Sequence, residues 1–326
     1  MPALSPRKSV GSIHMKPGFY AVVGNSDYIR LNKRRIPIWE LLDEQPTGWL
    51  RSLTSRSTVM PDRQPMIWDC GAFGYRNLDL PQIRGRFVTA HFCIYQYARL
   101  SKPGDAIVAP DCLLIGSQID QRRKFNREQA IEFIKLAVSQ LPEQVPMAAV
   151  HGLTLAERIQ RAIELYEIGY RAVGIGGLVA GARNFHSSLI AIAATIEAIR
   201  QIDTNVHFHV FGLCSPRYAR AFHQLGVSFD GSTYAKEAFI ARNFLMNECG
   251  RLVRYPAART DTKAIAPRCC CRACKILRQY QIDPRYYGKS RQHDIGRLAH
   301  NLNQLLLAHS HATSRLAASG LFQLQC

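Results

Sequence analysis

The chain has 326 residues, of which 47% are apolar, and this is enough for one α/β barrel with a small appendage. Its 42 Lys and Arg residues exceed its 24 Asp and Glu residues by 18, so we expect a polyanionic partner. The first twenty residues lack the continuous apolar stretch of a signal peptide, and no apolar run reaches about 18 residues. These features predict a cytoplasmic, reduced protein without a membrane partner.

Residues 1 to about 60 are polar, basic and weakly periodic, and only residues 20–24 have the pattern of a strand. The following part of the chain is regular. Short apolar runs, most of which end in a polar or glycine residue, alternate with stretches of helical character. The runs cover residues 66–69, 106–111, 147–151, 172–176, 206–211 and 227–230. This alternation is typical of parallel βα units.

The helical stretches carry signals for their ends. Thr154 and Glu157 form a capping box, and Gly169 is placed to end that helix. Pro216 follows Ser215 and opens another helix, and residues 187–200 form a third with one almost wholly apolar side. Units of this kind close into a barrel or form an open doubly wound sheet. Because no G-x-G-x-x-G follows the first strand, we predict a (β/α)8 barrel of the TIM type.

Basic residues are clustered along the chain. The clusters are Lys33, Arg34 and Arg35; Arg122, Arg123, Lys124 and Arg127; Arg251, Arg254 and Arg259; and Arg285, Lys289, Arg291 and Arg297. Any one cluster is ordinary for a solvated face. Together they favour a nucleic acid over a small soluble substrate, and no cationic amphipathic helix points to a membrane surface.

Near the C-terminus, a C-x-C-x-x-C run is followed 26 positions later by a histidine. Cys269, Cys271, Cys274 and His300 form a ligand set for tetrahedral zinc, and three thiolates with one imidazole leave no open position for substrate. We predict one structural Zn²⁺; a reduced cysteine cluster without metal is the alternative, and Cys270 is left over. The expected organisation is a basic N-terminal extension with a first strand over residues 1–60, a catalytic barrel over residues 61–264, and a zinc-binding segment with a C-terminal helix over residues 265–326.

Candidate site residues close the apolar runs, because the active site of such barrels lies at the carboxyl ends of the strands. In chain order they are Asp69, Asp111, His151, Gly176 with Gly177, Phe211 with Gly212, and Asp230. A single aspartate after a strand is usually a helix cap. Three aspartates at equivalent rim positions point instead to chemistry shared between carboxylates.

These residues resemble the motifs of the tRNA-guanine transglycosylases, a family that exchanges a guanine base for a 7-deazaguanine. Residues 69–73 (DCGAF) are similar to the family's Asp-Ser-Gly-Gly-aromatic motif, and Pro110-Asp111 to its purine-reading aspartate. Residues 175–178 (IGGL) resemble its Gly-Gly-Leu turn, and Phe229-Asp230 its nucleophile motif. The cysteine run with His300 has the family's zinc spacing, and the resemblance covers residues 65 to about 305.

The resemblance implies a role for each rim residue. Asp230 is the expected nucleophile and Asp69 the general acid/base of a double displacement, by analogy with retaining glycosidases. Asp111 is expected to accept hydrogen bonds from the guanine edge, and the backbone N–H groups of Gly177 and Leu178 to reach its carbonyl oxygen.

Two aromatic residues and one histidine complete the expected pocket. Phe73 and Phe211 stand where the family sandwiches the base, with core packing as the alternative. His151 stands where the family usually has glutamine, so it either contacts the purine or is a hydrogen-bonded structural histidine.

The polymer is predicted from what surrounds these motifs. Gly231-Ser232-Thr233-Tyr234 after the nucleophile is closer to the archaeal type, but the archaeal RNA-binding domains are missing. A compact, very basic chain is most similar to the branch that inserts 7-deazaguanines, such as 7-cyano-7-deazaguanine, into DNA. Proteins that open the duplex are possible helpers. The alternatives are a tRNA transglycosylase and a catalytically silent nucleic-acid-binding member; a zinc hydrolase conflicts with the closed ligand set.

Overall fold

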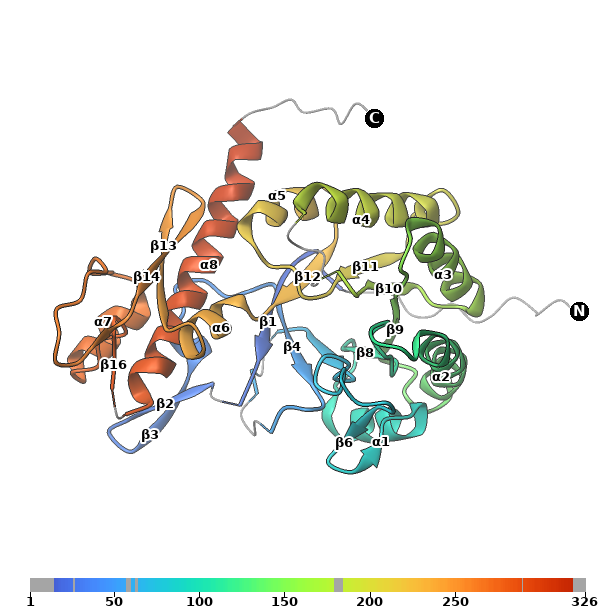
Figure 1. Ribbon diagram of the computed structural model, residues 1–326, viewed down its shortest axis with the longest axis horizontal. Coiled ribbons are helices and arrows are strands. Elements are labelled where there is room, and N and C mark those ends of the chain that lie inside the picture. The colour runs from blue at the N-terminus through green and yellow to red at the C-terminus, as the bar shows by residue number, and fades with distance from the viewer. Residues whose placement is uncertain are drawn as a thin grey trace, which may run out of the picture.

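A computed structural model describes residues 15–25, 27–56, 60–61, 64–178, 184–288 and 290–318. Its centre is a closed barrel in which eight parallel strands are hydrogen-bonded in the order β1-β12-β11-β10-β9-β8-β5-β4 (Figure 1). The barrel strands are β1 (Gly18–Val23), β4 (Gly48–Ser52), β5 (Met66–Asp69), β8 (Ala106–Val108), β9 (Val145–Val150), β10 (Ala172–Ile175), β11 (His207–Val210) and β12 (Ser228–Gly231). The predicted α/β barrel is thus confirmed.

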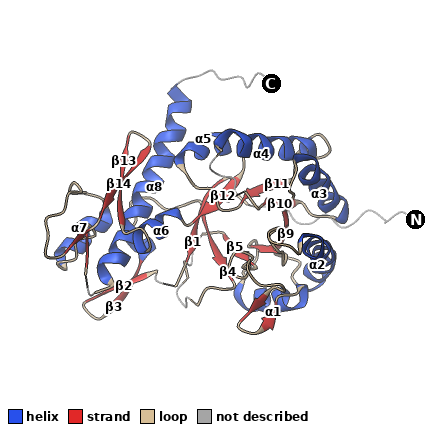
Figure 2. Cartoon of the chain, in the orientation of Figure 1, coloured by secondary structure: helices blue, strands red, loops and turns tan. Residues whose placement is uncertain are grey.

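Helices surround the barrel. They are α1 (Ala90–Leu100), α2 (Ile119–Gln140), α3 (Leu155–Ile168), α4 (Phe185–Arg200), α5 (Pro216–Gln224) and α6 (Thr233–Phe239). Among the described residues between β1 and β4 there is no α-helix; this connection contains β2 (Tyr28–Leu31), β3 (Arg34–Pro37) and the 3₁₀ helix η1 (Ile38–Leu41). The long C-terminal helix α8 (Gln292–Ala318) contacts η1, α5 and α6, so it covers this side of the barrel (Figure 2).

Local signals in the sequence explain the ends of these helices. The Thr154 side chain accepts a hydrogen bond from the N–H of Glu157, 3.2 Å away, at the start of α3. Gly169 ends the same helix with φ of 120°, a conformation that a side chain disfavours. Pro216 occupies the first turn of α5, where its missing N–H removes no helical hydrogen bond.

The barrel begins earlier in the chain than the expected boundary at residue 61, because β1 and β4 both lie within residues 1–60. The strand β4 was not predicted, since its sequence GWLRS contains only two large apolar residues. The first residue of β4, Gly48, has no room for a side chain. A Cβ there would lie 2.3 Å from a ring carbon of Tyr20 and 2.6 Å from the carbonyl oxygen of Pro65. Residues 1–14 of the expected extension lie outside the described residues.

The cysteine-rich part of the chain packs beside the barrel. The antiparallel hairpin β13 (Asn243–Glu248) and β14 (Arg251–Pro256) lies against α8, together with α7 (Arg272–Gln279). Two short strands, β15 (Ala258–Arg259) and β16 (Tyr286–Tyr287), pair in parallel. A further small hairpin, β6 (Gln82–Ile83) and β7 (Arg86–Phe87), precedes α1. The segment that packs with the cysteines therefore starts at β13 rather than at residue 265.

Apolar side chains fill the barrel below the carboxyl ends of its strands. Tyr20, Leu50, Ile67, Met147 and Ala172 belong to one buried cluster, contributed by five different strands. A larger cluster lies between the strands and the helices. Since the interior is packed, an opening for a substrate can exist only at the rim. In the part of the chain that the structure describes, no helix is both long and apolar enough to span a membrane.

Candidate active site

The predicted aspartates meet at the carboxyl-terminal rim of the barrel. Asp69 is the last residue of β5, Asp111 follows β8, and Asp230 lies in β12. Burial, followed by the nearby carboxylates of Asp111 and then Asp230, raises the pKa of Asp69 to about 7. The Asp69 side chain also accepts a hydrogen bond from the N–H of Gly71 at 2.9 Å. The rim therefore holds a carboxyl group that can gain or lose a proton near neutral pH.

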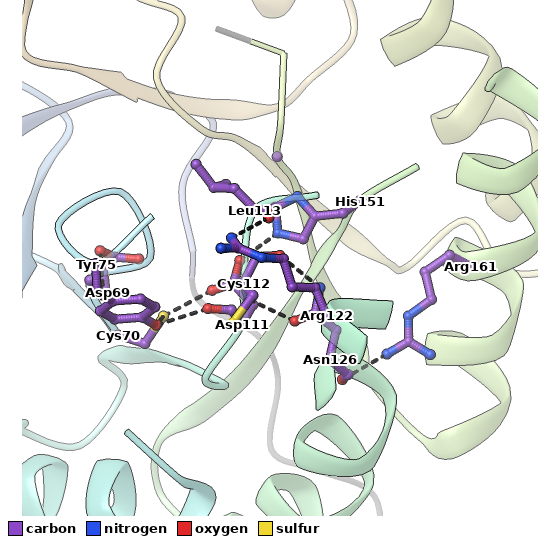
Figure 3. A network of polar contacts seen from close by, with 12 residues as sticks. Asp69, Cys70, Tyr75, Asp111, Cys112, Leu113, Arg122, Asn126, His151 and Arg161 are labelled. Atoms are coloured by element: carbon purple, nitrogen blue, oxygen red, sulfur yellow. Dashed lines mark hydrogen bonds and ion pairs between the residues drawn. The ribbon is translucent and has the colours of Figure 1, made fainter. Parts of the chain in front are cut away.

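Asp111 is the centre of a buried polar network (Figure 3). Its Oδ1 accepts from the thiol of Cys70 at 2.9 Å, and its backbone carbonyl accepts from the hydroxyl of Tyr75, also at 2.9 Å. Its Oδ2 is hydrogen-bonded to Nε2 of His151. Burial, and next the charge of Asp111, raise the pKa of the Cys70 thiol well above its usual range, so the thiol remains protonated and donates. Both carboxylate oxygens of Asp111 are thus held, one by Cys70 and the other by His151.

The loop that carries Asp111 is held by α2. The side chain of Asn126 accepts from the N–H of Cys112 at 2.6 Å and donates to its carbonyl at 2.9 Å. Arg122 donates to the carbonyl of Leu113 at 2.9 Å (Figure 3). These side-chain contacts satisfy backbone groups of the loop that no neighbouring strand pairs with, and so they help to fix the position of the Asp111 carboxylate.

His151 lies between Asp111 and the Gly176-Gly177 turn. Its Nδ1 is buried and has no hydrogen-bond partner among the described residues. A Cβ at Gly176 would lie 2.7 Å from the imidazole, and Gly177 has φ of 70°. Arg158 of α3 supports the turn by donating to the carbonyl of Gly176 at 2.8 Å. His151 therefore combines a structural hydrogen bond with an unused ring nitrogen, which fits either expectation for it.

Asp230 is 6% exposed and is oriented through one of its two oxygens. Its Oδ1 accepts from the N–H of Gly212 at 2.9 Å and contacts Nε2 of His209 at 3.2 Å. Among the described residues, Oδ2 receives no hydrogen bond. One oxygen is thus held by hydrogen bonds, while the other has none from the described residues.

The two expected aromatic residues differ in their surroundings. Phe73 is 52% exposed, and the guanidinium carbon of Arg76 lies 4.0 Å from the centre of its ring. Phe211 is partly buried; a Cβ at Gly174 would lie only 2.2 Å from its ring, so glycine at that position makes room for it. Leu178 is buried at the end of the described turn, and residues 179–183 lie outside the described residues.

The site contains residues that sequence reasoning missed. Cys70, Tyr75 and His209 all contact one of the rim aspartates. The one available signal was spacing, because His209 stands two residues before Phe211 and so shares its face of the strand. Cys70 and Tyr75 look like ordinary core residues in the sequence.

The four expected zinc ligands are close together. One ligand atom from each of Cys269, Cys271, Cys274 and His300 lies within 4.8 Å of all the others. Nε2 of His300 donates to the carbonyl of Leu245 at 2.6 Å, which leaves the lone pair of Nδ1 facing the sulfur atoms. The ring also stacks on Phe244. The group can therefore hold a metal such as zinc, whereas Cys270 is exposed and outside it.

Some of the clustered arginines are internal supports rather than surface charges. Arg297 is fully buried and donates to the carbonyls of Ala238, Pro284 and Tyr286. Arg122 is also buried, and Arg123 pairs with Asp120 and Glu157. Lys289 lies outside the described residues. The surface charge is therefore less clustered than the sequence indicates.

Comparison with known proteins bears on this resemblance. No protein-family model matches the chain. The chain is similar to a DNA-guanine transglycosylase from Salmonella montevideo, with 28% identity over 197 residues. The aligned region covers 55% of this chain and 43% of the relative, so the chain spans less than half of that protein's length. The similarity supports the resemblance to guanine transglycosylases.

Proposed function

We propose that the chain is a guanine transglycosylase that replaces guanine in DNA by a 7-deazaguanine, such as 7-cyano-7-deazaguanine. The observation that carries this proposal is the pairing of two unlike carboxyl groups on one barrel rim. Asp230 is held by hydrogen bonds to a single oxygen, and Asp69 has a pKa raised to about 7 by burial and its carboxylate neighbours. A double displacement requires one carboxylate that attacks and a second group that moves protons.

In the first half of the exchange, Oδ2 of Asp230 attacks C1′ of the flipped-out nucleotide. The bond from C1′ to the guanine nitrogen breaks, its electron pair leaves with guanine, and protonated Asp69 supplies a proton to the departing base. The product is a glycosyl ester on Asp230. In the second half, the Asp69 carboxylate takes a proton from the incoming base, whose nitrogen attacks C1′ and releases Asp230. Two inversions retain the configuration of the sugar.

The base pocket proposed here is formed by the other rim residues. Asp111 accepts from the adjacent N–H donors of the guanine edge, and the turn at Gly177 and Leu178 offers N–H groups to its carbonyl oxygen. The rings of Phe73 and Phe211 lie above and below the base. Stacking on them offsets part of the few kcal/mol that flipping a base costs.

Two further observations support a nucleic-acid polymer, and one of them favours DNA. The similar protein is named for a reaction on DNA, which favours DNA, and the formal charge of +18 favours a nucleic acid of either kind. A phosphate backbone supplies most of the affinity for such a surface. Proteins that open the duplex are proposed helpers, because a paired guanine resists flipping. One structural zinc per chain, held by the three cysteines and His300, stabilises the segment beside the barrel.

The test is a base-exchange assay with labelled guanine in single-stranded DNA, duplex DNA and tRNA. We expect wild type to release guanine from DNA and to form a covalent adduct, and Asp230→Asn to lose both activities while retaining DNA binding. Asp120→Asn, at an exposed carboxylate on α2, is the matched control and should be fully active.

Two outcomes would contradict the assignment. If Asp230→Asn kept near-normal turnover while Asp69→Asn lost it, the roles of the two residues would be wrong. If the protein exchanged guanine in tRNA but not in any form of DNA, even with partner proteins, the polymer would be wrong.

A further inference from the structure

A chain of polar side chains, partly buried at His207 and buried beyond it, ends at Asp230. His207 and His209 lie on β11, and Ser228 and Asp230 on β12, each pair two residues apart and therefore on one face. His209 and Ser228 are direct neighbours in the strand register. Oγ of Ser228 lies 2.9 Å from Nε2 of His207 and 2.8 Å from Nδ1 of His209. The other ring nitrogen of His209 reaches Asp230.

The proton arrangement in this chain follows from its two ends. An ionised Asp230 only accepts hydrogen bonds, so His209 must present an Nε2–H to it. Nδ1 of His209 then accepts the single proton of the Ser228 hydroxyl, whose oxygen lies closer to Nδ1, at 2.8 Å, than to the carbonyl oxygen of Phe208, at 3.2 Å. The serine oxygen in turn accepts from Nε2–H of His207. Burial, followed by the neighbouring His209, lowers the pKa of His207 to about 3, so this residue remains neutral.

We propose that Ser228 and His209 are positioning residues for the nucleophile. The serine hydroxyl holds His209 in its Nε2–H tautomer, and His209 with the N–H of Gly212 holds Oδ1 of Asp230 so that Oδ2 meets the sugar. The inference rests on the proposed function and adds two residues to it. After attack, Oδ1 is the carbonyl oxygen of the glycosyl ester, and the same donors stabilise the carboxylate when it leaves.

Other titratable groups also face Asp230 and must be separated from this effect. Asp69 lies across the rim on β5, while the thiol of Cys214 and the phenol of Tyr234 interact electrostatically with Asp230 from other sides. All three groups are retained when Ser228 is replaced. A difference in pH dependence between wild type and a Ser228 variant therefore reports the hydrogen bond from His209.

The kinetic test compares Ser228→Ala with Ser228→Thr, which keeps a hydroxyl. Without the serine proton, His209 no longer favours the Nε2–H form, and the hydrogen bond to Asp230 weakens. We expect kcat for exchange to fall roughly tenfold to a hundredfold in Ser228→Ala, with KM for DNA unchanged. Because the charged form of Asp230 loses a hydrogen-bond donor, the acid limb of the pH profile for exchange should move to higher pH. Ser228→Thr should restore both properties.

The control is Thr195→Val, which removes a buried hydroxyl that donates to the carbonyl of Ala191 on α4, away from the rim. It should lower stability without moving the pH profile. An acid limb that stays in place in Ser228→Ala, at normal metal content and DNA binding, contradicts the positioning role.

A second measurement needs no activity. In protein labelled with ¹⁵N-histidine, NMR shifts report which ring nitrogen carries the proton, and His209→Gln assigns the signals. We expect Nε2–H for His209 in wild type and a mixture of tautomers in Ser228→Ala. A protonated Nδ1 in wild type would overturn the inference. If wild type lacks exchange activity but shows the expected tautomer, the proposed function fails and the hydrogen-bonded chain stands.

Discussion

Burial, and then the carboxylates of Asp111 and Asp230 that share the rim, make the charge of Asp69 costly in the folded protein. Its pKa of about 7 in the folded state compares with 3.8 for the unperturbed group. Between these values the folded protein binds more protons than the unfolded chain. The free energy of unfolding therefore decreases as pH rises through this window.

Asp69→Asn removes that titration and is the first prediction. At pH 8 the variant should be more stable than wild type by roughly 1–3 kcal/mol, after discounting for the partial exposure of the carboxyl group. The gain should vanish once the pH is well below 3.8, where this carboxyl group is protonated in both the folded and the unfolded wild type. Urea unfolding at a series of pH values measures it. A constant difference between the two proteins at all pH values would contradict the raised pKa.

Gly174 and Phe211 provide a second prediction at single residues. A methyl group at position 174 would overlap the ring of Phe211 at 2.2 Å, so Gly174→Ala must displace that ring or the strand. We expect a loss of about 1–3 kcal/mol in stability and a higher KM for the incoming base. Gly24→Ala, where the nearest atom is 3.6 Å away, is the control and should change neither property. A normal KM in Gly174→Ala would argue against stacking on Phe211.

The sequence predicted the rim aspartates better than their surroundings. Asp69, Asp111 and Asp230 could be found because each follows an apolar run, which places it at the end of a strand. The contacts of Cys70 and His209 depend on which side chains face each other across neighbouring strands, and this requires the barrel register. The burial of Arg122 and Arg297 was unexpected, since their partners are backbone carbonyls distant in sequence.

At the scale of elements, predictions succeeded where hydrophobic pattern and capping signals agree. The strand β5 covers the predicted residues 66–69, and α3 runs between its predicted cap and glycine. The strand β4 was missed because its burial comes from the neighbouring strands and from Trp39, whose ring contacts Trp49, rather than from its own pattern. The last covering helix, α8, follows the cysteine-rich segment in sequence and was not expected against the barrel.

The candidate metal site joins α7, α8 and the β13–β14 hairpin, so we expect metal binding to contribute to the folding of all three. Cys274→Ser should lower the zinc content well below one ion per chain and reduce stability by several kcal/mol. Metal analysis and thermal unfolding, with and without a chelator, measure both effects. Cys270→Ser removes an exposed neighbouring thiol and should leave both unchanged. A protein that folds fully without metal would contradict a structural role.

At the scale of the whole molecule, exposed basic residues gather at the end that carries the cysteine-rich segment. Lys33, Arg34 and Arg35 lie on the β2–β3 hairpin, and Arg251 and Arg254 on β14. Both hairpins contact α8 and lie at the same end of the molecule (Figure 1). This end of the molecule is therefore the surface on which we expect phosphate contacts.

The last prediction concerns this surface. Affinity for DNA should fall steeply with salt, because each neutralised phosphate releases counterions with a slope of about −0.9 in a log–log plot. Replacing Lys33, Arg34 and Arg35 by Gln should weaken binding and make the slope shallower by about two to three. The control has the same change in charge at Arg99, Lys102 and Lys135, which lie on or beside α1 and α2.

The comparison between the two triple variants separates contact from net charge. Both lose three positive charges, so a general electrostatic attraction would weaken to a similar extent in each. Only direct phosphate contacts at the β2–β3 hairpin make the slope shallower in the first variant alone. Fluorescence anisotropy with a short duplex and with a single strand, from low to moderate salt, measures the slopes. Equal slopes for the two variants would place the DNA elsewhere on the molecule and leave the catalytic assignment of the rim untouched.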